Sequence, residues 1–168
     1  AAIAYFSAEI ALDPLNGESW ENRGKSHYEL GDYEKAIDDY SQAIKLDPIN
    51  YNLHLTIGCI YFESDQVENA IVSFSAAMKL ERKLSRQFEA YIGRAICYFQ
   101  LGDYPSAITD ASKMIEMWPD FFDFCILRGD AWLFLGDYEK AVEDYTSALE
   151  SIFSETYYCY EDTFQDFW

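Results

Sequence analysis

The chain has 168 residues and a formal net charge of -18 at pH 7, from 30 acidic and 12 basic residues. Contact with phosphates requires Lys and Arg side chains, so this balance disfavours nucleic acid as a partner and makes basic partners more plausible. The alternative is that the acids form a solvated outer face that keeps the protein in solution. No signal-peptide pattern or apolar run long enough to span a bilayer is present, so we expect no membrane partner.

One segment recurs along the chain. LGDYEKAIDDYSQAIKLDP at residues 30–48 returns as LGDYPSAITDASKMIEMWP at 101–119, and in part as LGDYEKAVEDYTSALE at 135–150. Alanines mark the same register at spacings of 34, 34, 37 and 34 residues: Ala2, Ala36, Ala70, Ala107 and Ala141. A unit of this length cannot bury its own apolar face, so the copies must stack, and function is expected on the surface that the stack creates.

Each copy is predicted to be a pair of helices. Apolar residues follow at helical spacing from Ala36 to Ile44. Gly31 followed by Asp32 indicates a left-handed helix terminator and then the N-cap of a second helix. Small residues on the first helices are expected to face the alanines of the second and let the helix backbones approach closely: Gly24, Gly58, Ala95 and Gly129.

The period and the residues at set positions within it resemble the tetratricopeptide repeat. The copy at 17–50 carries the family's signature residues: Trp20, Gly24, Leu30, Gly31, Tyr33, Ala36, Tyr40, Ala43 and Pro48. The copy at 51–84 is degenerate, because His54, Asp65 and Arg82 replace the usual Trp, Gly and Pro. The resemblance covers nearly the whole chain and implies an all-α fold, a right-handed α-solenoid of antiparallel helix pairs.

In chain order, we expect a single array with these parts: the second helix of a truncated repeat at 1–16, complete repeats at 17–50, 51–84, 88–121 and 122–155, and a tail at 156–168 that is a C-terminal capping helix or the start of a further repeat. The first segment aligns with the second helix of the next copy, and its partner helix is missing. The sequence is therefore expected to be a fragment of a longer array.

Three extra residues separate the repeats at 51–84 and 88–121. Basic side chains gather there: Lys79, Arg82, Lys83 and Arg86. We interpret them as cations that favour the C-terminal end of a helix dipole, in preference to a site for an anion or an acidic peptide. The insertion is expected to alter the rotation between the third and fourth helix pairs.

The resemblance implies a binding groove, because the first helices of tetratricopeptide repeats line a concave surface. The family's groove positions correspond here to the candidate groove residues: Asn22, Lys25, Asn52, Leu55, Cys59, Phe62, Glu89, Ile92, Ile96, Phe99, Asp123, Ile126, Asp130 and Leu133. They begin polar and become apolar towards the C-terminus. Such a strip is suited to an amphipathic helix or extended segment with apolar anchors and basic flanks, unless the side chains turn into the core or the chain's own tail covers them.

Two functions compete for this surface. The first is a protein-interaction scaffold whose groove binds a partner. The second is a structural subunit that self-associates or is built permanently into a larger assembly, burying the same strip. Light scattering separates them, because a monomer at all concentrations favours the first.

The resemblance also implies a partner that this chain does not bind. Family members that bind the acidic C-terminal tails of chaperones use a clamp of Lys, Asn and Arg on three first helices. The matching positions here are Glu21, Lys25, Thr56, Glu89 and Gly93. Carboxylates would repel an acidic tail where cations are needed for charge-assisted contacts, so no such binding is expected.

The sequence contains no complete motif for an enzyme or a cofactor site. Gly24-Lys25-Ser26 looks like the end of a phosphate-binding loop, but Ser19 stands where that loop requires Gly. His27 and His54 take the places of aromatic residues and are expected to pack.

The chain has four cysteines, Cys59, Cys97, Cys125 and Cys159, and they form no C-x-x-C motif. Only two histidines are present. We therefore expect no metal, no cofactor and no disulfide framework. The cysteines are interpreted as small packing residues in a reducing compartment, the cytoplasm or the nucleus.

The tail at 156–168 reads TYYCYEDTFQDFW. It starts where a further repeat should start, but Asp162 and Thr163 stand where Leu and Gly are expected. Its aromatic residues could cap the last apolar face of the array over Trp132, Tyr145 and Leu149. The rival interpretation is that they dock into the groove of the same molecule or of a neighbour.

Overall fold

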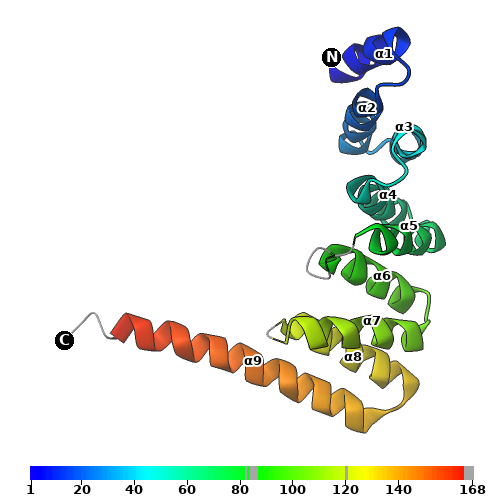
Figure 1. The fold of residues 1–168 in the computed structure, drawn as a ribbon. Coiled ribbons are helices and arrows are strands. Elements are labelled where there is room, and N and C mark those ends of the chain that lie inside the picture. The colour runs from blue at the N-terminus through cyan, green and yellow to red at the C-terminus, as the bar shows by residue number, and fades with distance from the viewer. Residues whose placement is uncertain (82, 84–86, 120, 165–168) are drawn as a thin grey trace. The chain divides into compact units, whose positions relative to one another are not determined.

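The computed structural model describes residues 1–81, 83, 87–119 and 121–164, with side chains in these ranges as far as residue 151. Its contacts divide the chain into two units, Ala1–Cys97 and Tyr98–Trp168. All regular elements of the described residues are α-helices, which Figure 1 labels in chain order: α1 (Ala2–Leu12), α2 (Gly17–Glu29), α3 (Tyr33–Leu46), α4 (Tyr51–Glu63), α5 (Val67–Leu80), α6 (Phe88–Gln100), α7 (Tyr104–Met117), α8 (Phe122–Leu135) and α9 (Tyr138–Phe164). The predicted all-α array of helical repeats is confirmed.

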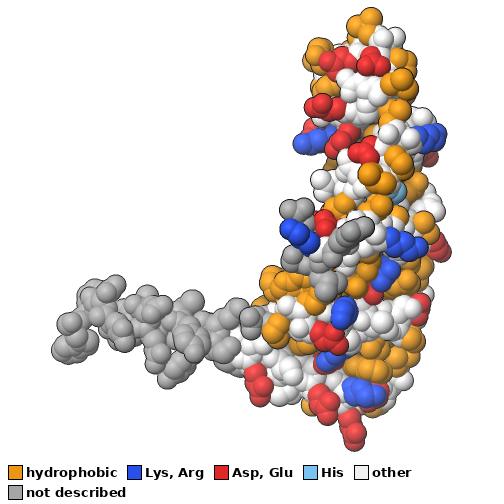
Figure 2. Space-filling model, viewed as in Figure 1, with side chains coloured by type: hydrophobic (Ala, Val, Ile, Leu, Met, Phe, Trp, Pro, Cys, Tyr) orange, Lys and Arg blue, Asp and Glu red, His pale blue; other side chains and the backbone are white. Residues whose placement is uncertain are grey.

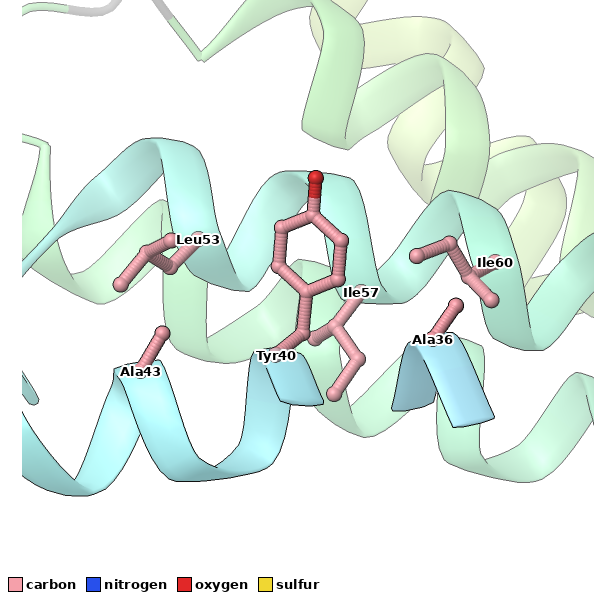
Figure 3. Close-up of a cluster of buried hydrophobic side chains, with 6 residues drawn as sticks. All are labelled: Ala36, Tyr40, Ala43, Leu53, Ile57 and Ile60. Carbon is pink, nitrogen blue, oxygen red and sulfur yellow. The ribbon is translucent and has the colours of Figure 1, made fainter. Parts of the chain in front are cut away.

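In the unit Ala1–Cys97, each helix from α1 to α4 packs against the next one along the chain, and α5 and α6 share an apolar cluster. The contact between the first two complete repeats is a cluster of apolar side chains. Figure 3 shows it, with three residues on α3 and three on α4: Ala36, Tyr40, Ala43, Leu53, Ile57 and Ile60. Each is at most 4% exposed, so this contact between repeats is as dry as a protein core.

The turns between the helices of a repeat follow the glycine signal, whereas Asp32 precedes α3 as predicted but makes no side-chain capping hydrogen bond. Gly31 and Gly136 adopt left-handed φ angles of 77° and 81°, which glycine reaches without steric cost. Asp65, which replaces the turn glycine of the degenerate repeat, adopts the same conformation with φ 62°. Asn16 and Asn50 cap α2 and α4, because each side-chain carbonyl accepts hydrogen bonds from two backbone N–H groups. The degenerate repeat therefore keeps its turn.

The glycines of the first helices lie against aromatic rings, whereas the sequence suggested that they face alanines. A Cβ atom on Gly24 would lie 2.9 Å from the Tyr40 ring, and one on Gly58 would lie 2.8 Å from the Phe74 ring. Because glycine has no side chain, it leaves room at these positions for a ring from the second helix of the same repeat.

Two Arg–Asp pairs, which the sequence analysis did not single out, join helices at equivalent places. Arg23 on α2 donates two hydrogen bonds to Asp39 on α3, of 2.8 and 2.6 Å, and one of 3.1 Å to the Ser7 hydroxyl on α1. Arg23 therefore links α2 to both α1 and α3.

The second pair repeats this geometry in the unit Tyr98–Trp168. Arg128 on α8 donates to Asp144 on α9 at 2.9 and 2.6 Å, and to the Ser112 hydroxyl on α7 at 3.0 Å. The two carboxylate side chains, of Asp39 and Asp144, are only 5% exposed.

In the unit Tyr98–Trp168, α8 packs against both α7 and α9. The helix α9 runs without interruption from Tyr138 to Phe164. A separate capping helix would need a turn after the repeat, and α9 has none as far as Phe164. The side chains of the tail lie outside the described residues, so its capping or docking role stays a hypothesis.

The basic cluster predicted at the insertion lies partly outside the described residues, which include Lys79 and Lys83 but neither Arg82 nor Arg86. Its role and the effect of the insertion on rotation therefore stay predictions. Within the described residues, no helix combines the length and apolar character that a membrane crossing needs.

Candidate functional site

The fourteen candidate groove residues all lie on the first helices of the repeats, α2, α4, α6 and α8. Each is exposed or half-buried, and none is fully buried. Figure 2 shows that hydrophobic side chains reach the visible surface between acidic and basic ones. The candidate groove residues are therefore accessible, and their role in binding stays a prediction.

On α4, two of the apolar candidates also contribute to the core. Leu55 and Phe62 are half-buried and pack against a cluster that includes Phe74 of α5 and Cys97 of α6. Cys59, one turn along the same helix, is exposed. A substitution at Phe62 therefore perturbs packing as well as the surface, which makes Phe62 a poor probe of binding.

Glu63, at the end of α4, was not among the candidate residues, but it links the first two complete repeats. Its carboxylate accepts a 2.6 Å hydrogen bond from the Tyr28 hydroxyl and a 3.3 Å hydrogen bond from the Tyr33 hydroxyl. The hydrogen bond to Glu63 is the main reason that the pKa of Tyr28 rises to about 12. A carboxylate next to half-buried tyrosines gave no sequence signal, because its partners lie 30 and 35 residues away.

Cys59 lies within the electrostatic influence of two carboxylates from different helices. Desolvation raises the pKa of its thiol first, and the negative charges of Glu63 on α4 and Glu89 on α6 raise it further. A thiol with a raised pKa is a weak nucleophile at neutral pH, so Cys59 is suited to contact and not to covalent chemistry. The two carboxylates make this part of the candidate groove a place for cationic side chains.

On α6, the candidate residues lie before and after Gly93, which packs against the core. Ile96 is 39% exposed, Ile92 is half-buried and Glu89 is exposed. Gly93 lies against the Phe74 ring so closely that a Cβ atom there would be 2.5 Å from the ring carbon Cζ. A clamp arginine at this position would therefore need Phe74 to move.

In the unit Tyr98–Trp168, the apolar end of the candidate groove contains three packed aromatic rings. Tyr104 stacks on Phe134 with ring centroids 5.1 Å apart, and Phe99 meets both rings edge-on at 5.4 and 5.6 Å. Phe134 remains 63% exposed and its neighbour Leu133 is 44% exposed. The three rings therefore pack together in one aromatic cluster.

The other candidates on α8 are less uniform. Ile126 is 36% exposed and Asp123 is exposed. The carboxylate of Asp130 accepts a 2.7 Å hydrogen bond from the Tyr145 hydroxyl of α9. This hydrogen bond is the main cause that raises the pKa of Tyr145 to about 12. Asp130 is therefore partly engaged within the unit.

Both histidines occupy packing positions, as expected. His54 Nε2 lies 3.0 Å from the Pro48 carbonyl oxygen, six residues earlier, as Trp20 Nε1 lies 2.9 Å from that of Pro14. A carbonyl can only accept, so His54 donates and reproduces the tryptophan's hydrogen bond.

His27 is 8% exposed, and its Nδ1 atom has no hydrogen-bond partner among the described residues. Lys25 and Ser26 lie within α2, where the Ser26 hydroxyl donates to the Asn22 carbonyl oxygen. Among the described residues, no group of His, Cys, Asp and Glu side chains could hold a metal ion.

Comparison with protein families gives two matching models, both described as the tetratricopeptide repeat. One model matches residues 17–50, and the other matches residues 55–121 and 99–153. Together they cover well over half of the chain.

Among curated proteins, the chain is similar to Hsp70-Hsp90 organizing protein of Triticum aestivum, with 36% identity over 69 residues, which is 41% of this chain and 12% of that protein. It is also similar to Hsp70-Hsp90 organizing protein 2 of Arabidopsis thaliana, with 39% identity over 61 residues, 36% of this chain and 11% of that protein. The matched part thus spans about an eighth or less of the length of these relatives.

Among solved structures, a crystal structure of MamA protein has a TM-score of 0.84 and 24% identity, covering 93% of this chain and 84% of that chain. A tetratricopeptide repeat protein from Parabacteroides merdae ATCC 43184 has a TM-score of 0.65 and 20% identity, covering 89% of this chain and 57% of that chain. At these identities, the likeness shows the fold alone.

Proposed function

Because the chain belongs to the tetratricopeptide repeat family, we propose that it is a protein-interaction scaffold without enzymatic activity, whose first helices bind a helical or extended segment of a partner protein. The observation that carries this proposal is the exposure of apolar side chains on first helices, at Ile96, Ile126 and Leu133. Ile96 lies in the unit Ala1–Cys97 and the other two lie in the unit Tyr98–Trp168, so each unit offers an apolar contact of its own.

The charges near these side chains support one kind of partner. Glu63 and Glu89 are near Cys59 in one unit, and the exposed Asp123 lies on the same helix as Ile126 in the other. With a net charge of -18 over the chain, a segment with apolar anchors and basic flanks is favoured, and nucleic acid is disfavoured. The three described cysteines are free thiols, which is consistent with the proposed reducing compartment, the cytoplasm or the nucleus.

We test the scaffold function by comparative capture. The full chain, Ile96→Asp and Val72→Asp are immobilised, and the proteins that each retains from a cell extract are identified. Val72 is the matched control, because it is 68% exposed but lies on the second helix α5. The proposal expects proteins that the full chain and Val72→Asp retain and that Ile96→Asp loses.

Equal retention by all three proteins, with far-UV circular dichroism unchanged, would contradict the groove. A particle mass that doubles with concentration in light scattering, and that Ile96→Asp reduces to one chain, would favour the self-associating structural subunit.

Acidic chaperone tails are not expected to bind, although the curated relatives are named for organising Hsp70 and Hsp90. Glu21 and Glu89 stand where the clamp needs cations, and the Phe74 ring fills the space beside Gly93. Calorimetric titration with an acidic chaperone tail peptide should give no heat of binding at micromolar concentrations. A fitted dissociation constant in the micromolar range would show that the chain binds such tails by another arrangement.

A further inference from the structure

Among the described residues, no helix packs over a row of apolar side chains on α9. Tyr138, Val142 and Leu149 share one face of the helix, because positions four and eleven residues apart nearly coincide around its axis. They are 66%, 62% and 54% exposed. We call these three residues the α9 stripe.

The same positions on an earlier second helix are covered by the first helix that follows. On α3 they are Tyr33, Ile37 and Ile44, which are partly buried. They pack against the cluster to which α4 contributes Leu53, Ile57 and Ile60. The helix α4 therefore shows how a helix is held at this position of the repeat.

The other second helices repeat this arrangement. Val67 of α5 corresponds to Tyr138 and is 4% exposed, in a cluster that includes Ala90 of α6. Ile108 of α7 corresponds to Val142 and is 9% exposed, and α7 packs against α8. The uncovered α9 stripe continues a helix–helix interface that forms on α3, α5 and α7.

The charges beside the stripe are acidic. Glu139, Glu143 and Glu150 each follow a stripe residue by one position and are exposed. Lys140, the one basic residue in the described side chains of α9, pairs with Asp137 and lies over the Trp132 ring. An incoming helix with basic side chains beside its apolar face would gain electrostatic attraction, whereas a second copy of α9 would place carboxylates against carboxylates.

We propose that the α9 stripe docks a basic amphipathic helix of a partner protein, which lies on α9 as α4 lies on α3. Its apolar residues recur at i, i+4 and i+7, the spacing of Leu53, Ile57 and Ile60, and Lys or Arg residues flank them. This site is on a second helix and goes beyond the groove of first helices.

The probe is a fluorescently labelled synthetic helical peptide. It carries Leu, Ile and Ile at positions i, i+4 and i+7, and lysines at the flanking positions. Its twin carries glutamates at those positions. Fluorescence anisotropy at low salt measures the binding of each probe to the full chain. The lysine probe should bind at least about tenfold more tightly than the glutamate probe, because the flanking charges on α9 are carboxylates.

Val142→Asp should weaken binding of the lysine probe by at least about tenfold, through loss of an apolar contact. Val72→Asp is the matched control with the same added charge, and it should bind as the unaltered chain does. Ile96→Asp should also leave binding unchanged, because it alters only the groove. Non-specific attraction to an acidic protein cannot give this result, since an added carboxylate would then strengthen binding of the lysine probe.

Equal binding by Val142→Asp and Val72→Asp, with the same helix content by circular dichroism, would overturn the proposal. A dimer of the chain that Val142→Asp dissociates would identify a second copy as the occupant instead. At least tenfold tighter probe binding after deletion of residues 157–168 would identify the chain's own tail as the occupant. Loss of groove partners through Ile96→Asp has no bearing on these outcomes, so the two proposals fail separately.

Discussion

Single residues decide how closely the helices of a repeat approach. In three repeats a glycine on the first helix lies against a ring on the second: Gly24 with Tyr40, Gly58 with Phe74, and Gly129 with Tyr145. In the remaining repeat the sequence has alanine at both equivalent positions, Ala95 and Ala111. The loss of a ring therefore accompanies the gain of a methyl group, which fills only part of the space that the ring occupies in the other repeats.

Gly93→Ala should destabilise the protein by about 1–3 kcal/mol, as overpacking of a core does. Its new Cβ atom would meet the Phe74 ring at 2.5 Å, and Phe74 is only 2% exposed and already lies against Gly58. Urea unfolding followed by circular dichroism measures the change. Gly17→Ala is the control, because its Cβ atom would lie at an ordinary 3.7 Å from Leu46 and should be neutral or stabilising.

Equal free energies of unfolding for Gly93→Ala and the unaltered chain would show that the Phe74 ring has room to move. The contact between Gly93 and Phe74 would then not set the spacing of α5 and α6.

At the scale of helices, the Arg23–Asp39 and Arg128–Asp144 pairs add directional contacts to apolar packing. Each arginine uses its guanidinium group to contact a serine on the preceding helix and an aspartate on the following one. The hydrogen bond to aspartate is the main reason that the pKa values of Arg23 and Arg128 are raised. Bidentate geometry fixes direction as well as distance, so these pairs set the register between helices.

Arg128→Met should cost about 3–5 kcal/mol, because it leaves the carboxylate of Asp144 nearly buried without its cation. The double variant Arg128→Met with Asp144→Leu should recover much of that loss, since no charge is then stranded. Urea unfolding of both variants measures the difference. Lys113→Met is the control, because its pair with Glu116 is exposed to solvent and should contribute little to stability.

A cost below that of Lys113→Met would show that Asp144 finds solvent or another partner when Arg128 is removed. The pair would then be an accessory to apolar packing and not a determinant of register.

At the scale of the whole molecule, tyrosine is the residue type whose titration is altered most widely. Tyr28, Tyr40, Tyr51 and Tyr145 each have a pKa raised to about 12. Hydrogen bonds to Glu63 and Asp130 are the main causes for Tyr28 and Tyr145. Burial is the main cause for Tyr40 and Tyr51. All four therefore resist ionisation in the folded chain.

These shifts predict loss of stability in alkali. Unfolded tyrosine ionises with a pKa of about 10, so between pH 10 and 12 the unfolded chain releases protons that the folded chain retains. The stabilisation is complete below pH 10 and falls as the pH rises towards 12. The free energy of unfolding, measured in urea at each pH, should decrease through this window.

Absorbance at 295 nm measures the ionisation of tyrosine in the folded chain, and part of this signal should appear only near pH 12. A single transition of all 14 tyrosines near pH 10 in the folded chain would contradict the shifts. In Glu63→Gln the late fraction should shrink, because Tyr28 loses the carboxylate that holds its proton.

The sequence by itself determined the repeat, the helix pairs and their turns. These features depend on short-range rules: apolar residues at helical spacing and a left-handed terminator at Gly31. The packing role of His54 was also readable, because the register placed it where Trp20 stands in the preceding repeat.

Only the tertiary structure decided which surfaces these helices leave open. It placed glycines against rings, joined Tyr28 and Tyr33 through Glu63, and showed that Phe62 serves the core. The continuous α9 left Val142 uncovered. Contacts of this kind join residues that are far apart in the chain, and they depend on the volumes and angles of packed helices, which no short window of sequence contains.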